Sequence, residues 1–349
     1  MPTERLEATN PAHITHAAKL LRAGGTVAFP TETVYGLGAN ALDPFAVEKI
    51  FLAKQRPHWD PLIVHIADLD QLPQLAEPSS RIARQLIARF WPGPLTLLLP
   101  RTNQVPDAVT AGRALVGVRM PNHPVARALI RQAGVPIAAP SANTFGHTSP
   151  TTAQHVLDDL DGRIDAVLDG GPTEVGLEST VVGIESSEEE PWNRAVIYRP
   201  GGITLAELEA EAGTGAVQLY VAASQFLVPE SLPSPGVGIR HYAPRAAVLL
   251  VNLDTTSHRF VEDTLVEAID TATTEGSRVA VMLPRAWNPS AAALRYSWGP
   301  WQDHAALARR LYIGLRTLDD AGATAIVCPV PQGRGIAEAI RDRLHKAAK

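Results

Sequence analysis

The sequence predicts an α/β protein in two parts: a mixed, twisted sheet with helices on its faces, then a small Rossmann-like domain with a parallel sheet. Up to residue 212, apolar strands and amphipathic helices interleave irregularly, and some strands follow one another directly. From Ala247 onward, strands and helices alternate regularly. A chain of 349 residues is also long enough for two domains that each bury a core.

Each element of the first part follows from apolar periodicity and from boundary signals. A helix is expected at 13–24, where Gly24-Gly25 ends it, and another at 44–54, which Asp43 caps and Pro44 opens. Further helices are expected at 79–90, 123–133, 151–160 and 204–212, and strands at 26–29, 62–66, 95–99, 116–120, 166–169, 179–184 and 195–199. Loops are expected at 31–40, 140–143 and 186–190.

A shift in composition divides the chain into residues 1–212, 213–245 and 246–349. The middle segment is rich in Gly, Pro and Ser, which predicts a linker. Its end, Arg240-His241-Tyr242, is polar and aromatic, so we expect the linker to close over the first domain as a lid. In the last domain we expect strands at 247–253, 278–283 and 323–328, and helices at 259–275, 303–321 and 335–347.

Composition excludes several classes of protein. The formal net charge of −5 argues against a chain coated in nucleic acid, although it leaves room for one basic groove. The only cysteine, Cys328, excludes a disulfide framework and an all-cysteine zinc site, and its apolar surroundings favour a structural thiol. Neither a signal peptide at 1–20 nor a membrane-spanning run is found, so a cytoplasmic protein with no membrane partner is expected. The last domain also lacks a Gly-x-Gly-x-x-Gly turn, which argues against a dinucleotide site.

The segment Lys54–His65 carries the clearest chemical signal. Lys54 and Arg56 stand beside two prolines, just before an apolar strand. Proline restricts the backbone, so both cations are presented with little freedom to lose on binding. Arg binds phosphate oxygens through a planar fork and Lys acts as a point charge, which points to a polyphosphate ligand. The alternative is a solvated turn with two surface cations.

Other candidate residues also follow or end strands, where ligands gather in open sheets. Arg119 ends an apolar strand and needs an anion if it is buried, either a ligand or an internal carboxylate. Ser141 and Ser179 are either ligand contacts or turn and cap residues, and His65 is either a ligand contact or a core histidine. Glu32 and Glu178 are either groove acids or, as is commoner, solvated loop carboxylates.

Six ordered motifs together resemble the YrdC/YciO family. They are Pro30–Leu37, Lys54–His65, Trp91–Thr96, Arg119–Pro121, Pro140–Asn143 and Glu178–Val181. The resemblance runs from about residue 10 to about residue 205. Residues 234–244 resemble the linker signature of the long, two-domain members, and the regular C-terminal part fits their second domain.

This resemblance implies a nucleotidyltransferase that makes L-threonylcarbamoyladenylate and pyrophosphate from L-threonine, bicarbonate and ATP. It further implies Mg²⁺ on the ATP phosphates, with no metal held by the protein. A downstream transferase would then move the threonylcarbamoyl group to the tRNA adenosine next to the anticodon, so tRNA is an indirect partner.

The resemblance also assigns residues to roles. Lys54 and Arg56 would be catalytic and face the triphosphate. The threonine site would comprise Thr33, His65, Arg119, Ala139 and Ser179. The ATP side would comprise Arg56, Asp60, Leu115, Ser141, Ser149, Arg199 and Tyr242.

Two positions depart from the family pattern. Asp60 stands where relatives commonly have Asn, and an ionised carboxylate cannot donate a hydrogen bond. Val237-Gly238-Ile239 replaces the more usual Met-Lys-Tyr of the linker.

Two other functions remain open at this point. One is a carbamoyl-transfer domain like that of hydrogenase-maturation proteins, which the single cysteine disfavours because those proteins carry a cysteine-rich zinc segment. The other is a non-enzymatic RNA-binding module, which the net charge disfavours.

Overall fold

The computed structural model describes residues 2–78, 80–185, 194–220, 241–252, 258–274, 276–287 and 294–348. These residues form two compact units. The first contains the described residues up to Tyr220, except for 146–149 and 175–177. Those two short segments group with the described residues from His241 onward, which form the second unit.

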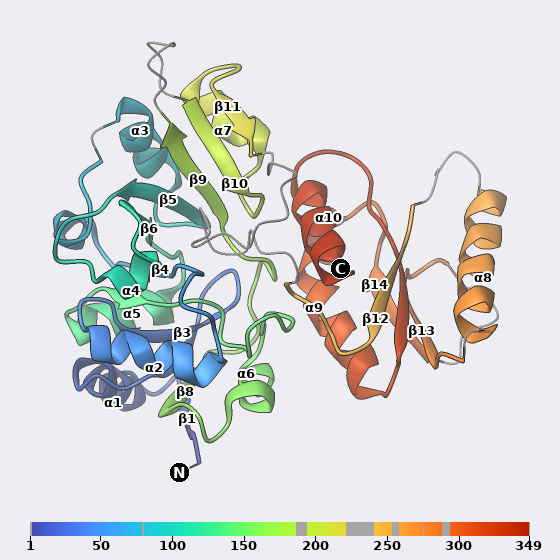
Figure 1. Ribbon diagram of the computed structural model, residues 1–349, viewed down its shortest axis with the longest axis horizontal. Helices are drawn as coiled ribbons and strands as arrows, with labels where there is room; N and C mark the ends of the chain where they lie inside the picture. The colour runs from blue at the N-terminus through green and yellow to red at the C-terminus, as the bar shows by residue number, and fades with distance from the viewer. Residues whose placement is uncertain are drawn as a thin grey trace. The chain divides into compact units, whose positions relative to one another are not determined.

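The first unit is a mixed sheet with helices on both faces (Figure 1), as the sequence predicts. Its strands lie in the order β1-β8-β2-β3-β7-β4-β6-β5-β9-β10-β11. The strands are β1 Glu4–Glu7, β2 Val27–Pro30, β3 Tyr35–Asn40, β4 Ile63–His65, β5 Leu95–Pro100, β6 Leu115–Arg119, β7 Ile137–Ala138, β8 Ala166–Asp169, β9 Thr180–Glu185, β10 Arg194–Arg199 and β11 Val217–Leu219. The helices are α1 Pro11–Arg22, α2 Pro44–Lys54, η1 Leu69–Gln74, α3 Arg81–Phe90, α4 Asp107–Thr110, α5 Pro124–Ala133, α6 Ala153–Leu160 and α7 Leu205–Ala212.

Two large apolar clusters help to hold this unit together, one on each face of the sheet. Helices α1 and α5 share one cluster with β2 and β8, and helices α2, α3, α6 and α7 contribute to the other. The helix starts follow ordinary capping rules, since the Asp43 carboxylate accepts from the Phe45 amide and Pro44 opens α2. Helix α2 ends at Lys54. Gln55 follows in the left-handed conformation, and the chain then turns into Arg56.

Two predicted irregular segments of this unit contain strands. The loop expected at 31–40 is a tight turn at 31–34 followed by β3, and the linker expected from residue 213 contains β11. Strand β3 is built largely from small residues. Gly38 lies so close to the Phe29 ring that a Cβ atom on it would be only 2.7 Å from a ring carbon. Such a segment has low intrinsic strand propensity, so its pairing with β2 and β7 decides its conformation.

The second unit is a parallel sheet in the order β12-β15-β13-β14. Its elements are β12 Ala247–Val251, α8 His258–Thr274, β13 Val279–Pro284, β14 Leu294–Gly299, α9 His304–Asp320, β15 Ala325–Pro329 and α10 Ile336–Ala347. Figure 1 shows α8 on one face of this sheet and α9 and α10 on the other. The Rossmann-like prediction is confirmed, with β14 as an additional edge strand that the sequence pattern did not predict.

Burial raises the pKa of the Cys328 thiol, which lies in β15, and this agrees with a structural cysteine. No helix in the described ranges is long and apolar enough to cross a membrane. The loop expected at 186–190 and the linker residues 221–240, which include Val237-Gly238-Ile239 and Arg240, lie outside the described residues.

Candidate active site

Five neighbouring strands of the first unit bring site residues to one edge of the sheet. Strands β4 and β6 are parallel and end there with His65 and Arg119. Strand β5 is antiparallel to β6 and begins there, β9 begins beside it just after Ser179, and β10 ends there with Arg199. The topology therefore gathers residues that lie up to 134 positions apart in the chain, counted from His65 to Arg199.

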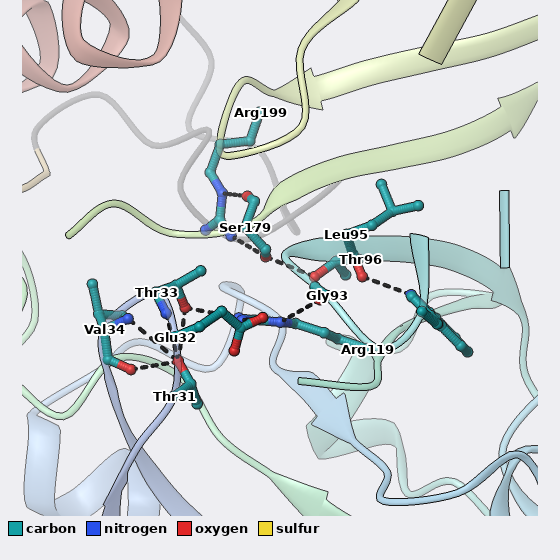
Figure 2. Close-up of polar contacts among 11 residues, drawn as sticks. Thr31, Glu32, Thr33, Val34, Gly93, Leu95, Thr96, Arg119, Ser179 and Arg199 are labelled. Carbon is teal, nitrogen blue, oxygen red and sulfur yellow. Dashed lines mark hydrogen bonds and ion pairs between the residues drawn. The ribbon is translucent and has the colours of Figure 1, made fainter. Parts of the chain in front are cut away.

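Arg119 is the centre of the first cluster (Figure 2). Its Nη1 donates to Thr33 Oγ1 at 2.9 Å and its Nε donates to the Gly93 carbonyl at 3.3 Å. Its Nη2 lies 2.7 Å from Glu32 Oε1, and the two side chains are only 4% and 6% exposed. An internal carboxylate, one of the two partners that the sequence leaves open, thus lies against Arg119.

Glu32 is thus a buried acid and not the solvated loop carboxylate that is commoner at such a position. It lies in the turn between β2 and β3, which Thr31 fixes by donating to the Val34 carbonyl at 2.7 Å. The Thr31 hydroxyl also lies 2.8 Å from that of Thr33. This turn places Glu32 and Thr33 on the same arginine. Glu178 is buried as well.

His65 lies beside Arg119 in the sheet, because β4 and β6 pair these two residues directly. Burial, and then the positive charge of Arg119, lowers the pKa of His65 to about 3. The imidazole is therefore neutral at physiological pH. Its ring also contacts Phe29 edge to face at 6.3 Å between centroids.

A second arginine lies near the same edge (Figure 2). Arg199 donates through Nε to the Ser179 carbonyl and through Nη2 to Ser179 Oγ, both at 3.1 Å. Ser179 Oγ in turn lies 2.7 Å from Thr96 Oγ1. The chain after Arg199 passes so close to Ser179 that a Cβ atom on Gly201 would lie 2.3 Å from the Thr180 amide. Glycine is therefore required to hold Arg199 and Ser179 together.

Lys54 and Arg56 form a second cluster near the opposite end of β4. The Lys54 ammonium is buried and donates to the carbonyls of Ser141 and Asn143, both at 2.5 Å. Burial and the charge of Arg56 lower the pKa of Lys54, whereas the two carbonyl acceptors favour its charged form. An ammonium group has three donors, and two of them are used by these carbonyls.

Arg56 and Asp60 are ion-paired, with Nη2 and Oδ2 2.9 Å apart and side chains that are 3% and 1% exposed. Arg56 also donates to the carbonyls of Asp60 and Pro61, and its guanidinium lies 5.8 Å from the centre of the Phe145 ring. Burial raises the pKa of Asp60, and the charges of Arg56, Lys54 and Arg199 oppose that shift. Lys54 and Arg56 are both buried, so the alternative of a solvated turn with two surface cations is wrong.

The remaining predicted residues are more dispersed. Ala139 is buried and its amide donates to the Ile63 carbonyl, which ties it to β4. Ser141 contributes its carbonyl to Lys54, whereas Leu115, at the start of β6, is 38% exposed. Ser149 and Tyr242 belong to the second unit. The Tyr242 ring is buried there beside Tyr312, with the Arg343 guanidinium 5.0 Å from its centre.

Three polar or aromatic partners of the site were not among the predicted site residues. Thr96 contacts Ser179, Asn143 accepts from Lys54, and Phe145 lies against Arg56. Thr96 and Asn143 belong to motifs that the sequence singles out, so the sequence indicates that they lie near the site. It does not indicate which residues they contact. Phe145 carries no such signal, because an aromatic residue in a loop is compatible with many roles.

The chain resembles known proteins along nearly its whole length. A family model for Sua5, YciO and YrdC, described as "Telomere recombination", matches residues 19–201, and one described as "Threonylcarbamoyl-AMP synthase, C-terminal domain" matches residues 203–349. A threonylcarbamoyl-AMP synthase of Bacillus subtilis is 43% identical over 343 residues, which is 97% of this chain and 94% of the relative. One from Pyrococcus abyssi is 42% identical over 332 residues, covering 95% and 93%.

The structural likeness has the same extent. The crystal structure of Pyrococcus abyssi Sua5 complexed with L-threonine matches with a TM-score of 0.87 and 39% identity, over 99% of this chain and 97% of that one. The two family models together match residues 19–201 and 203–349, which is nearly the whole chain. The chain therefore belongs to the Sua5, YciO and YrdC family, in its two-domain form with the C-terminal domain of threonylcarbamoyl-AMP synthases.

Proposed function

We propose that this protein is a threonylcarbamoyl-AMP synthase that converts L-threonine, bicarbonate and ATP into L-threonylcarbamoyladenylate, pyrophosphate and water. The observation that carries this proposal is the arrangement of charge along β4. A buried Arg119–Glu32 pair lies by one end of this strand, and the buried cations Lys54 and Arg56 lie by the other. Three strand residues span about 10 Å, a separation suited to an amino acid at one end and a triphosphate at the other.

The chemistry needs such a site because the reactants repel one another. The amine of threonine attacks the carbon of bicarbonate, a C–N bond forms, and water leaves to give a carbamate anion. A carbamate oxygen then attacks the α-phosphorus of ATP, and the bond to pyrophosphate breaks. Both steps bring anions together, so fixed cations lower the barrier by holding the reactants and by compensating their charge.

The contacts of the predicted threonine-site residues support the roles proposed for them. We assign the substrate carboxylate to Arg119, whose guanidinium is held in place by Thr33 and Gly93. The neutral His65, together with Ser179 and the Ala139 backbone, would complete the wall of this site. A fixed guanidinium loses little freedom when it binds a carboxylate.

The nucleotide side is assigned to Lys54, Arg56, Asp60, Ser141 and Arg199, with Leu115, Ser149 and Tyr242 as further ATP contacts. Lys54 has a third donor for a phosphate oxygen, beyond its two carbonyl partners in the described structure. No cluster of three or more His, Cys, Asp or Glu side chains suited to a metal ion occurs in the described ranges. We propose that Mg²⁺ arrives on the ATP phosphates as part of the substrate.

The product is a mixed anhydride of a carbamate and a phosphate, which transfers its acyl group readily. We propose that a downstream transferase uses it to modify the tRNA adenosine next to the anticodon.

The proposal is tested by omitting substrates one at a time. Pyrophosphate release should require threonine, bicarbonate and ATP together, and mass spectrometry of the complete mixture should detect the threonylcarbamoyl adenylate. Pyrophosphate release that continues unchanged without threonine, and with no acyl adenylate formed, would contradict it.

A further inference from the structure

The Arg119–Glu32 pair is one of two buried ion pairs described above, and it is the one at the proposed amino-acid end of the site. The two side chains are 4% and 6% exposed, and their nearest charged atoms lie 2.7 Å apart. The contact has ion-pair distance without hydrogen-bond alignment, and neither Glu32 oxygen has a hydrogen-bond donor among the described residues. A buried pair with unsatisfied acceptors contributes little to stability, since its desolvation cost is not repaid. Such an arrangement fits a binding site better than a structural one.

We propose that Glu32 binds the ammonium group of the amino-acid substrate, while Arg119 beside it binds the carboxylate. This inference rests on the proposed function and adds a residue to it. A free amino acid is a zwitterion whose two charges are separated by a single carbon atom. An arginine and a glutamate side by side present the complementary pair of charges, so the site can accept the substrate without becoming net charged.

Two other buried acids lie near the clusters. Asp60 also has carboxylate oxygens without a hydrogen-bond donor among the described residues, but it pairs with Arg56 in the second cluster, before the start of β4. Glu178 has its own interactions. His65 is neutral because its pKa is lowered to about 3, so it does not repel an ammonium group. Glu32 is therefore the acid beside Arg119 whose oxygens can still accept hydrogen bonds from a ligand.

The turn that carries Glu32 is also fixed before any ligand arrives. The Thr31 hydroxyl donates to the Val34 carbonyl and accepts from the amides of Thr33 and Val34. Thr33 Oγ1 accepts from Arg119 and lies 2.8 Å from Thr31 Oγ1, so one chain of contacts links the turn to the arginine (Figure 2). Because the turn is already ordered, little conformational freedom is lost on binding, and more of the favourable charge interaction contributes to affinity.

Two analogues of threonine isolate the two charges. In 2,3-dihydroxybutanoate a hydroxyl replaces the ammonium group, and in threoninol a hydroxymethyl group replaces the carboxylate. Calorimetric titration of the full-length protein should show threonine binding about tenfold to a hundredfold more tightly than the dihydroxy acid, because a charge-assisted hydrogen bond is lost. Wild-type protein that binds the two acids equally well would overturn the inference without any variant.

Glu32→Gln is the decisive variant because it keeps the size of the side chain and removes its charge. It should lower the ratio of threonine affinity to dihydroxy-acid affinity about tenfold or more, while the affinity for the dihydroxy acid stays the same or rises. Threoninol binding should fall with that of threonine. Glu48→Gln on the surface of α2, where Glu48 pairs with His58, is the matched control and should leave the ratio unchanged.

A thermal melt establishes whether each variant is folded. If Glu32→Gln does not fold, Glu32→Asp moves the carboxylate back by one methylene and should lower the same ratio several-fold. A ratio equal to that of the wild type in the folded variants would overturn the role of Glu32 while leaving the proposed function intact. Wild-type protein that binds no threonine at all would instead contradict the proposed function itself.

Discussion

Arg119 illustrates how a single residue joins the stability of this fold to its chemistry. It stands in a buried strand, and its guanidinium is shared between Thr33, Gly93 and Glu32. Sequence alone indicated that a cation in an apolar strand needs an anion, but it did not indicate which one. The identity of the partner depends on the β2–β3 turn meeting the end of β6, which are 86 residues apart at Thr33 and Arg119.

Replacing Arg119 should damage the use of threonine more than the use of ATP. We expect Arg119→Ala to lower kcat/KM for threonine about tenfold to a hundredfold or more, because a charge-assisted hydrogen bond to a carboxylate contributes about 1.5–3 kcal/mol. The variant should also be less stable, since Glu32 is left buried without its cation. Steady-state kinetics with each substrate varied in turn measure the effect. Arg131→Ala, which removes a surface arginine paired with Asp68, is the control. Unchanged threonine KM and kcat in a folded Arg119→Ala variant would refute the assignment.

His65 should make the protein sensitive to mild acid. Its pKa is about 3 in the folded protein and about 6.5 in an unfolded chain, so the unfolded state binds more protons between these values. Stability from the neutral histidine is therefore complete above about pH 6.5 and is lost as the pH falls toward 3. Between pH 7 and pH 5 the loss should be about 2 kcal/mol.

Denaturant unfolding of the wild type and of His65→Gln at the two pH values isolates this contribution from that of other groups. The wild type should lose more stability than the variant on acidification. Equal losses of stability in the wild type and the variant would show that His65 is not a buried, neutral histidine.

Asp60 should behave as an internal partner that a nucleotide replaces. It is ion-paired with Arg56 and lies within the electrostatic reach of Lys54 and Arg199. Asp60→Asn removes a negative charge next to the proposed phosphate site, so ATP binding should be retained or strengthened. The free variant should be less stable, because Arg56 keeps its charge without the carboxylate. The rise in Tm on adding ATP should thus be larger for Asp60→Asn than for the wild type. A smaller rise would indicate that the carboxylate itself serves the nucleotide.

At the scale of elements, the sequence was most informative where apolar periodicity and capping signals agreed. Helix α2 lies at the predicted residues, with Asp43 and Pro44 at its start. Strand β3 was missed because its glycines and alanine resemble a loop, and β11 because its three residues follow a glycine-rich turn. Both owe their conformation to neighbouring strands, which a local pattern cannot reveal.

Strand β11 and helix α7 also change where the first domain should be cut. Leu208 of α7 and Val217 of β11 belong to the main apolar cluster, and β11 pairs with β10. A fragment ending at Tyr220 should therefore fold, whereas one ending at Thr204 should be markedly less stable. Burial of two such side chains alone contributes about 3–6 kcal/mol. Urea unfolding of both fragments measures the difference, and fragments of equal stability would show that these two elements are dispensable.

At the scale of the whole molecule, the two-part α/β architecture was predictable, but the neighbours within each sheet were not. Strand β7 lies between β3 and β4, although almost 100 residues separate it from β3 in the chain. That insertion brings Ser141 and Asn143 to Lys54. The motifs identified the chemistry-bearing segments, while the topology determined which of them meet.

Ser149 and Tyr242, two of the residues proposed as ATP contacts, group with the second unit. Tyr242 is buried there and has a positive φ of 65°, which a non-glycine residue adopts only when its surroundings hold it. Its ring packs beside Tyr312 and Arg343. The conformation of Tyr242 is thus fixed within its own unit, a fact that its motif alone did not indicate.

The proposed function requires that one site join an amino acid, bicarbonate and ATP into an acyl adenylate. Transfer of label from radioactive bicarbonate into a nucleotide by the full-length protein, measured with and without threonine, tests this requirement. We expect label in an adenylate only when threonine and ATP are both present. Lys54→Ala should reduce it at any threonine concentration, and Arg119→Ala should reduce it most at low threonine. Label that enters the nucleotide equally well without threonine, or no label in the nucleotide under any condition, would show that the protein is not such a synthase.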